Sequence, residues 1–204
     1  MTVPLVLASA SPARLATLQA AGIEPEVRVS GVDETDPAVT RGLSEPKLLA
    51  LVLAMAKARD VAGTVQGALV IGCDSILDLD GDAMGKPRDA AEAMARWRLM
   101  RGRTGVLHTG HWLVDTRPVE LDQRPACGTV ESAVIHFADV TDAEINAYVA
   151  TGEPLQVAGG FTIDGLGGAF VRGIEGDPHT VVGLSLPLLR RLLPLLDLSW
   201  LDLV

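Results

Sequence analysis

One carboxylate, Asp74, stands at an unusual place in the sequence. The small and apolar residues 69–73 predict a buried strand, and Asp74 follows where that strand is expected to end. Residues 80–82, AspGlyAsp, predict a tight turn, and the returning segment then reaches Lys86. This spacing predicts that Asp74 and Lys86 lie near one another. We therefore expect them to form half of an active site for an anionic substrate.

A second set of polar residues lies in the first strand-turn-helix. The pattern predicts a strand at 4–8 and a helix at 13–21, with Ser11 as its N-cap. The hydroxyls of Ser9 and Ser11, together with the unpaired N–H groups of the helix start, can hold a phosphate, with Arg14 close by. The alternative is that Ser11 only caps the helix and Arg14 is a solvated charge. The residues by themselves leave both interpretations open.

Glu34 and Lys57 each have an ordinary explanation when taken alone. Glu34 lies in an acidic loop after a predicted strand at 26–30, and such loops are usually solvated, although carboxylates are also ligands of Mg²⁺. Lys57 lies late in a helix predicted over 44–62, where the helix dipole favours a basic residue. Neither residue indicates a site without further support.

The rest of the chain alternates strand-like and helix-like segments. Capping-box spacings start helices at Asp89 and Thr141, and glycines are concentrated in 158–168, where the backbone must approach something closely. Further strands are predicted at 106–115, 129–137 and 169–172, and further helices at 89–100, 141–152 and from 185. With no linker in the sequence, we expect one α/β domain over residues 1–204.

Composition excludes several classes of protein. The chain has 204 residues, of which 48% are hydrophobic, and a formal net charge of −9. This charge argues against a broad nucleic-acid surface, which needs a basic stripe, but not against a small phosphorylated ligand, because charges beyond ~10 Å are screened. The sequence has no signal-peptide pattern and no apolar run of the ~20 residues that a membrane span needs. We therefore expect a cytoplasmic protein with no nucleic-acid or membrane partner, in which Cys73 and Cys127 are free thiols.

Several motifs with known chemistry do not match. Residues 81–87 have a GlyLys pair but not the spacing of a P-loop, and residues 165–170 lack the third glycine of a dinucleotide fingerprint. His108 and His111 are a poor zinc pair, because residues three apart on a strand point to opposite faces.

Short segments along nearly all of the chain share a specific order and spacing. They are LeuAlaSerAlaSerPro (7–12) with Arg14, ValAspGlu (32–34), AlaLysAlaArg (56–59), IleGlyCysAspSer (71–75), GlyLysPro (85–87), GlyArgThr (102–104), HisThrGly (108–110), TyrValAlaThrGlyGluPro (148–154), IleAspGlyLeuGly (163–167), GluGlyAsp (175–177) and ValValGlyLeu (181–184). With these segments together, the chain resembles the Maf family, the septum-formation-inhibitor-like nucleotide pyrophosphatases.

This resemblance implies an α/β fold with a mixed, strongly twisted sheet, flanking helices and a central cleft, related to inosine triphosphate pyrophosphatases, and often a homodimer. It implies hydrolysis of a nucleoside triphosphate between the α and β phosphates, giving monophosphate and pyrophosphate, with a divalent cation, Mg²⁺ or Mn²⁺. By the same resemblance Asp74 is the proton acceptor, and Glu34, Lys57 and Lys86 are the other charged positions.

The resemblance also places Ser9 and Arg14 against the phosphates, and it leaves some roles open. Glu34 and Asp74 can divide metal binding and proton abstraction between them in either order, or one of them can do both. The chain departs from many relatives at Asp164, where a glutamine expected to face the base is usual, and at Ser75, where threonine is usual. An acceptor-only carboxylate pairs with a different base edge from an amide, so the preferred base stays open.

Two other functions remain possible at this point. The first is a nucleotide-binding regulator of cell division whose hydrolysis is incidental. The second is an α/β domain that binds a sugar phosphate or another small anion. The presence of two carboxylates beside a polyanion site favours an enzyme, because binding alone does not require them.

Overall fold

The structure is a computed structural model that describes residues 2–40, 42–118 and 125–204. Its strands are β1 (Leu5–Leu7), β2 (Glu26–Val27), β3 (Leu69–Leu79), β4 (Asp82–Met84), β5 (Thr104–Asp115), β6 (Ala126–Phe137) and β7 (Val171–Glu175). Within the described residues they form one seven-stranded sheet in the order β2-β1-β3-β5-β6-β7, with β4 paired to β3. The β1 pairings are parallel and the others are antiparallel. This confirms the expected α/β class with a mixed sheet.

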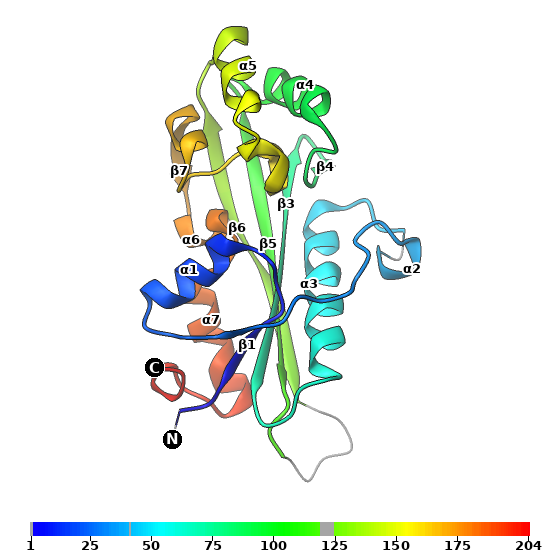
Figure 1. Ribbon diagram of the computed structural model, residues 1–204, viewed down its shortest axis with the longest axis vertical. Helices are drawn as coiled ribbons and strands as arrows, with labels where there is room; N and C mark the ends of the chain where they lie inside the picture. The colour runs from blue at the N-terminus through cyan, green and yellow to red at the C-terminus, as the bar shows by residue number, and fades with distance from the viewer. Residues whose placement is uncertain (1, 41, 119–124) are drawn as a thin grey trace.

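Helices flank this sheet (Figure 1). They are α1 (Pro12–Ala20), α2 (Pro37–Thr40), α3 (Pro46–Ala62), α4 (Ala90–Met100), α5 (Asp142–Ala150), α6 (Pro178–Val182) and α7 (Leu186–Leu192), with short 3₁₀ turns η1 (Glu153–Gln156), η2 (Ala158–Gly160), η3 (Leu166–Phe170), η4 (Leu193–Leu196) and η5 (Trp200–Asp202). In the described parts of the chain, none of the helices has the length and apolar character to cross a bilayer.

The two predicted capping boxes differ in the structure. At α5 the box is complete: Thr141 Oγ1 accepts the Glu144 N–H, and Glu144 accepts the Thr141 N–H at 2.7 Å. At α4 only half of it forms. Asp89 accepts the Glu92 N–H at 2.8 Å, but the Glu92 carboxylate accepts the Arg88 N–H at 3.0 Å instead of that of Asp89. Glu92 also pairs with arginine side chains, and this competing attraction explains the difference.

Several predicted strand boundaries were wrong: the strand expected at 26–30 is β2, at 26–27, the one expected at 129–137 starts at 126, and two further differences concern the site. The strand expected to end at Asp74 continues to Leu79, because β5 pairs with it throughout residues 69–78. The strand expected at 169–172 is β7, at 171–175, because the preceding glycine-rich residues form the 3₁₀ turn η3. Both differences come from pairing or packing with segments that are distant in the sequence.

Helix α3 packs against one face of the sheet with unusually little space. A Cβ atom at Gly72 would lie 2.4 Å from the Ala54 carbonyl oxygen, and one at Gly110 would lie 2.3 Å from that of Ala50. Gly72 and Gly110 therefore allow the helix backbone to touch β3 and β5. This close approach brings the side chains of α3 to the centre of the sheet.

The other face and the far end of the sheet have their own cores. Leu18 of α1, Ile71 of β3 and Leu188 of α7 belong to one buried apolar cluster. At the end that carries α4 and α5 (Figure 1), Trp97 packs edge-on against Phe137, with ring centroids 5.8 Å apart. Between these two cores lies the middle of β3.

The middle of β3 has an open edge. β1 pairs with residues 69–71 and β4 pairs with residues 77–79. Both must lie on the same edge of β3, because β5 occupies the other edge along the whole segment. In the described sheet, residues 72–76 therefore have no strand partner on that edge, and Asp74 lies at its centre. It is the neighbouring strand β1 that ends here, not β3 itself.

Candidate active site

Lys57 joins two carboxylates at this open edge. Its Nζ donates to Glu34 Oε1 at 2.6 Å and also to Asp74 Oδ1. Asp74 is 6% exposed and Lys57 8%, whereas Glu34 is exposed. The sequence predicted all three as site residues, and the structure brings them into contact. The helix dipole alone does not explain Lys57, which is buried and paired.

Local periodicity explains why Asp74 meets Lys57. Side chains alternate along a strand, so Asp74 points to the same face of β3 as Gly72, which is the face covered by α3. On α3, Lys57 belongs to the buried stripe that contains Ala50 and Ala54, because residues three and four apart share a helix face. The close packing of α3 on Gly72 and Gly110 therefore also sets the position of Lys57.

The electrostatic environment shifts the pKa values of Glu34 and Asp74 in opposite directions. Burial acts to raise the pKa of Glu34, but Lys57, with Lys86 and Arg14, outweighs it, so that this pKa lies below its usual value. For Asp74, burial is the larger effect, and the pKa is raised despite Lys57. Glu34 is thus the group that stays ionised, and Asp74 is the more basic one. Carboxyl groups whose environments separate their pKa values are typical of acid–base sites.

Arg14 is not the solvated charge that one interpretation of the sequence proposed. It is 8% exposed, and its guanidinium reaches across the open edge to the backbone and hydroxyls of β3. Nη1 donates to the Cys73 carbonyl at 2.8 Å and to Ser9 Oγ at 3.0 Å, Nη2 donates to Ser75 Oγ at 3.2 Å, and Nε donates to the Gly183 carbonyl at 2.8 Å. Arg14 therefore satisfies a carbonyl that β1 leaves unpaired and holds two of the predicted substrate-binding serines.

The remaining predicted residues have different surroundings. Ser11 caps α1, accepting the Arg14 N–H at 3.4 Å, and its own N–H donates to Ser9 Oγ at 3.2 Å. Lys86 follows β4, is exposed, and lies close enough to Glu34 to lower the pKa of that residue.

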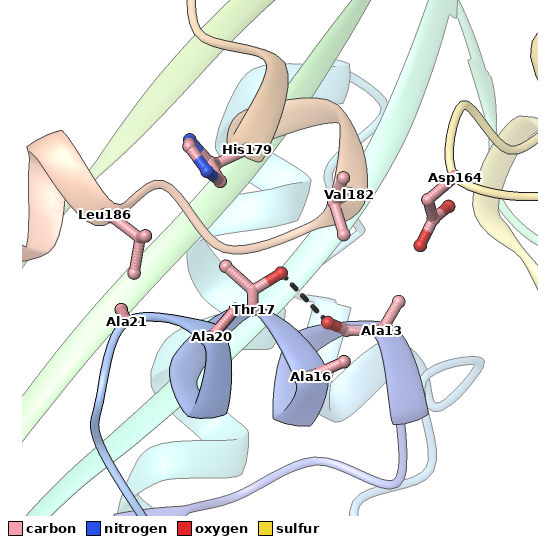
Figure 2. Close-up of a pocket in the computed structure, with 9 residues that line it drawn as sticks. All are labelled: Ala13, Ala16, Thr17, Ala20, Ala21, Asp164, His179, Val182 and Leu186. Atoms are coloured by element: carbon pink, nitrogen blue, oxygen red, sulfur yellow. Dashed lines mark hydrogen bonds between the residues drawn. The ribbon is translucent and has the colours of Figure 1, made fainter.

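Asp164 lines a groove between α1 and the 178–186 segment (Figure 2). The groove has a volume of about 310 Å³, and its walls are mainly small and apolar, including Ala13 and Val182, with His179 at the rim. The groove follows α1 along its whole length, from Ala13, which directly precedes Arg14, to Ala21 at the other end of the helix. Figure 2 shows the Asp164 carboxylate reaching from the glycine-rich segment toward Val182 and the start of α1.

Sequence reasoning missed a buried polar chain on the face of β5 opposite α3. Thr109 Oγ1 lies 2.9 Å from Ser75 Oγ and donates to the Thr180 carbonyl at 2.7 Å. His111 lies 3.0 Å from the Thr109 carbonyl through Nδ1 and accepts the Ser185 N–H through Nε2 at 2.8 Å. The only signal in the sequence was a set of polar residues within a buried strand. As predicted, His108 is on the other face, against Ser132.

His111 makes folding stability depend on pH. Burial lowers its pKa to about 4, against about 6.5 in an unfolded chain. The unfolded state therefore binds more protons as the pH falls below 6.5, and the stability present above 6.5 is lost toward pH 4. We expect the free energy of unfolding to fall by about 2 kcal/mol between pH 7 and pH 5. His108, whose pKa burial also lowers, acts in the same direction.

Urea unfolding at the two pH values measures this effect. The raised pKa of Asp74 acts in the opposite direction, since the native state then binds the extra proton. The comparison is therefore made in the Asp74→Asn variant, which lacks that contribution. A free energy of unfolding that stays level or rises between pH 7 and pH 5 would contradict the prediction.

The donor set at the open edge fits a metal that is held mainly by the substrate. Mg²⁺ is typically bound by one or two carboxylates, together with phosphate oxygens and water. Glu34 and Asp74 provide that number and converge on a single cation, the Lys57 ammonium. Among the described residues, no group of three or more His, Cys, Asp or Glu side chains could hold a metal without the substrate.

The open strand edge of this mixed α/β sheet gathers two carboxylates, a buried lysine and helix-start hydroxyls, and side chains and helix-start groups of these kinds suit an anionic ligand. The model of the Maf-like protein family matches residues 4–196, and the chain belongs to this family. The resemblance drawn from the motifs is confirmed.

Relatives and one solved structure show the extent of the similarity. A protein of Salinispora tropica named nucleoside triphosphate pyrophosphatase is 60% identical over 199 residues, covering 95% of this chain and 84% of its own length. A Streptomyces coelicolor protein of the same name is 60% identical over 191 residues, covering 93% and 88%. A HAM1 protein structure from Coxiella burnetii matches with a TM-score of 0.38 and 20% identity, covering 68% of this chain and 75% of that one.

Proposed function

We propose that this protein is a nucleoside triphosphate pyrophosphatase, a hydrolase that cleaves the bond between the α and β phosphates and releases monophosphate and pyrophosphate. The observation that carries the proposal is the buried Asp74 carboxylate with a raised pKa, held by Lys57 beside the ionised Glu34. Membership of the Maf-like family and the names of relatives that are 60% identical support the same activity.

In this reaction each residue has a task that its environment favours. Asp74 accepts a proton from the water that attacks the α phosphorus, because its raised pKa makes it the better base. Lys57 orients that carboxylate, and Lys57 and Lys86 offset the negative charge of the phosphate oxygens. Ser9 and Ser11 donate to the phosphate chain at the start of α1. Arg14 keeps Ser9 and Ser75 in position. The attacking water gives its proton to Asp74 as its oxygen bonds to the α phosphorus, and the bond from that phosphorus to the leaving pyrophosphate breaks.

We propose that a divalent cation, Mg²⁺ or Mn²⁺, takes part, held by Glu34 and Asp74 with Glu34 as the main ligand. The separation of their pKa values supports this division, because the group that stays ionised suits the metal. The cation would supply further neutralisation of phosphate charge. The pair of carboxylates, without a third ligand from the described residues, supports a cation that arrives with the triphosphate.

A product assay tests the proposed reaction. Purified protein with Mg²⁺ or Mn²⁺ is incubated with ordinary and modified nucleoside triphosphates, and monophosphate plus pyrophosphate is separated from diphosphate plus phosphate by chromatography. We expect only the first pair, and no turnover after addition of a chelator. Diphosphate and phosphate would contradict cleavage between the α and β phosphates. Binding without turnover on any triphosphate would instead favour the regulator of cell division.

The same proposal includes the domain organisation, the cellular location and the oligomeric state of the protein. We propose a single domain over residues 1–204 that is cytoplasmic and forms a homodimer, with a nucleoside triphosphate as its ligand and no nucleic-acid or membrane partner. Free Cys73 and Cys127 support a reducing compartment. The sheet edge at β2 supports self-association, because Val27 in this strand is 42% exposed and Val29, two residues after it, is 63% exposed. Sedimentation equilibrium measures the oligomeric state, and a monomer at all concentrations would exclude the dimer.

A further inference from the structure

A single carboxylate, Glu153, organises the glycine-rich segment that carries Asp164. Its Oε1 accepts the Tyr148 hydroxyl at 2.8 Å, the Thr162 hydroxyl at 2.6 Å and the Gly167 N–H at 2.9 Å. Its Oε2 accepts the Leu166 N–H at 2.9 Å. Partial burial acts to raise the pKa of Glu153, but these four donors outweigh it and hold that pKa at about 2. Glu153 is thus ionised, and both of its carboxylate oxygens accept hydrogen bonds.

The glycines of this segment are needed because its backbone lies against that acceptor. A Cβ atom at Gly165 would lie 2.7 Å from Glu153 Oε2. One at Gly167 would lie 2.3 Å from the Tyr148 hydroxyl, which itself donates to Glu153. Real Cβ atoms do not approach other atoms this closely, so Gly165 and Gly167 permit the contact. The backbone of the glycine-rich segment therefore approaches two groups, the Glu153 carboxylate and the Tyr148 hydroxyl.

Asp164 is held between the anchored positions. Thr162 lies two residues before it and Leu166 two residues after it, and Glu153 binds both. Asp164 itself is exposed and lines the groove beside α1. The orientation of the Asp164 side chain therefore depends on the backbone of residues 162–166, and hydrogen bonds to Glu153 hold both ends of this segment.

The same segment is also joined to the backbone that precedes Lys86. The Gly159 N–H donates to the Gly85 carbonyl at 3.1 Å, and Trp97 Nε1 donates to the Gly160 carbonyl at 2.8 Å. The segment therefore connects the aromatic core to two predicted site residues, Asp164 on its own backbone and Lys86 on the adjoining one. A shift of the segment would move a substrate-binding side chain without touching Asp74 or Lys57.

We propose that Glu153 is a positioning residue that fixes residues 162–167 so that Asp164 faces the substrate, and that it thereby sets the affinity for the nucleoside triphosphate. This inference rests on the proposed function, because it takes Asp164 as a substrate contact. Glu153 does not touch the reacting atoms, and it acts through the backbone on either side of Asp164.

Steady-state kinetics of Glu153→Gln, Asp164→Asn and the double variant test this role. The glutamine keeps the length of the side chain but presents an N–H₂ group to one of its donors. We expect KM to rise about tenfold in Glu153→Gln, with kcat within threefold of the unsubstituted protein. In the double variant we expect KM no higher than in the worse single variant, because both changes remove the same contact. An unchanged KM, or two effects that multiply, would overturn the proposal.

Glu144→Gln is the matched control. Glu144 also accepts backbone and hydroxyl hydrogen bonds, from Thr141 at 2.7 Å, but it caps α5 and not the glycine-rich segment. Replacement of the Glu144 carboxylate by an amide should lower the melting temperature and leave KM unchanged. If both variants lose the same thermal stability and only Glu153→Gln changes KM, the effect is positional. If Glu144→Gln raises KM to the same degree, the role of Glu153 is merely structural.

Amide hydrogen exchange separates this inference from the proposed function. The Leu166 and Gly167 amides should exchange slowly in the unsubstituted protein and faster in Glu153→Gln and Glu153→Ala. A protein that turns over no triphosphate overturns the proposed function and the effect on affinity, whereas the exchange rates still decide whether Glu153 holds the segment. Equal exchange at both amides in all variants would overturn the anchoring itself.

Discussion

The Asp74→Asn variant is expected to lose about 10³-fold in kcat, because general-base catalysis by a positioned side chain typically contributes 10²–10⁴-fold. Asparagine has nearly the same shape, and its oxygen can still accept the hydrogen bond from Lys57. It cannot accept a proton from the attacking water. The effect should therefore appear in kcat, with KM nearly unchanged. The measurement is the rate of pyrophosphate release with saturating metal and substrate.

Two further observations make this prediction specific. The free energy of unfolding should change little, because Lys57 keeps its bond to Glu34 at 2.6 Å. The acid limb of the kcat–pH profile should disappear in the variant. In the unsubstituted protein that limb belongs to Asp74, whose raised pKa means that activity is lost as the pH falls through a value above the usual carboxyl range. Activity within a few-fold of the unsubstituted protein would show that Asp74 is not the base.

Lys57→Met is expected to abolish measurable turnover and to lower the free energy of unfolding by about 3 kcal/mol, the lower end of the cost of breaking a buried ion pair. Lys57 and Asp74 are both buried, so removal of the lysine leaves an uncompensated carboxylate. Its pKa would rise further, and at neutral pH the base would be partly protonated. Urea unfolding and the pyrophosphate assay measure the two effects.

A double variant and a control on the same helix distinguish these effects. Lys57→Met combined with Asp74→Asn should regain most of the lost stability, because no buried charge is left unpaired, while activity stays absent. Lys47→Met, at an exposed position in the first turn of α3, should change stability by no more than about 0.5 kcal/mol and leave turnover intact. A double variant that is no more stable than Lys57→Met would contradict the ion-pair explanation.

The sequence by itself was sufficient for features that depend on near neighbours. Ser11 caps α1 and Thr141 forms a complete capping box, because the groups involved are within three residues of one another. The motif order identified the family, and the alternation of strands and helices indicated the α/β class. The opposite faces of His108 and His111 followed from the period of a strand.

Tertiary structure decided the features that depend on distant partners. Asp74 is not at the end of its own strand, because β5 extends the pairing of β3 beyond it, and the edge is open only where β1 stops. Arg14 is buried because its guanidinium binds the carbonyl of Gly183, 169 residues away, and that of Cys73, 59 residues away. No local pattern encodes such pairings.

The same distinction applies to the chemistry. The sequence named Glu34, Lys57 and Asp74 but left the carboxylates with interchangeable roles. The packing of α3 on the sheet makes Asp74 buried and leaves Glu34 exposed. Desolvation acts to raise both pKa values, but it outweighs the nearby cations only at Asp74, so the pKa of Asp74 is raised and that of Glu34 is lowered. Residue types and their order were enough to identify the family and to predict which residues form the site, whereas burial, which depends on the whole fold, supports the different roles that we propose for the two carboxylates.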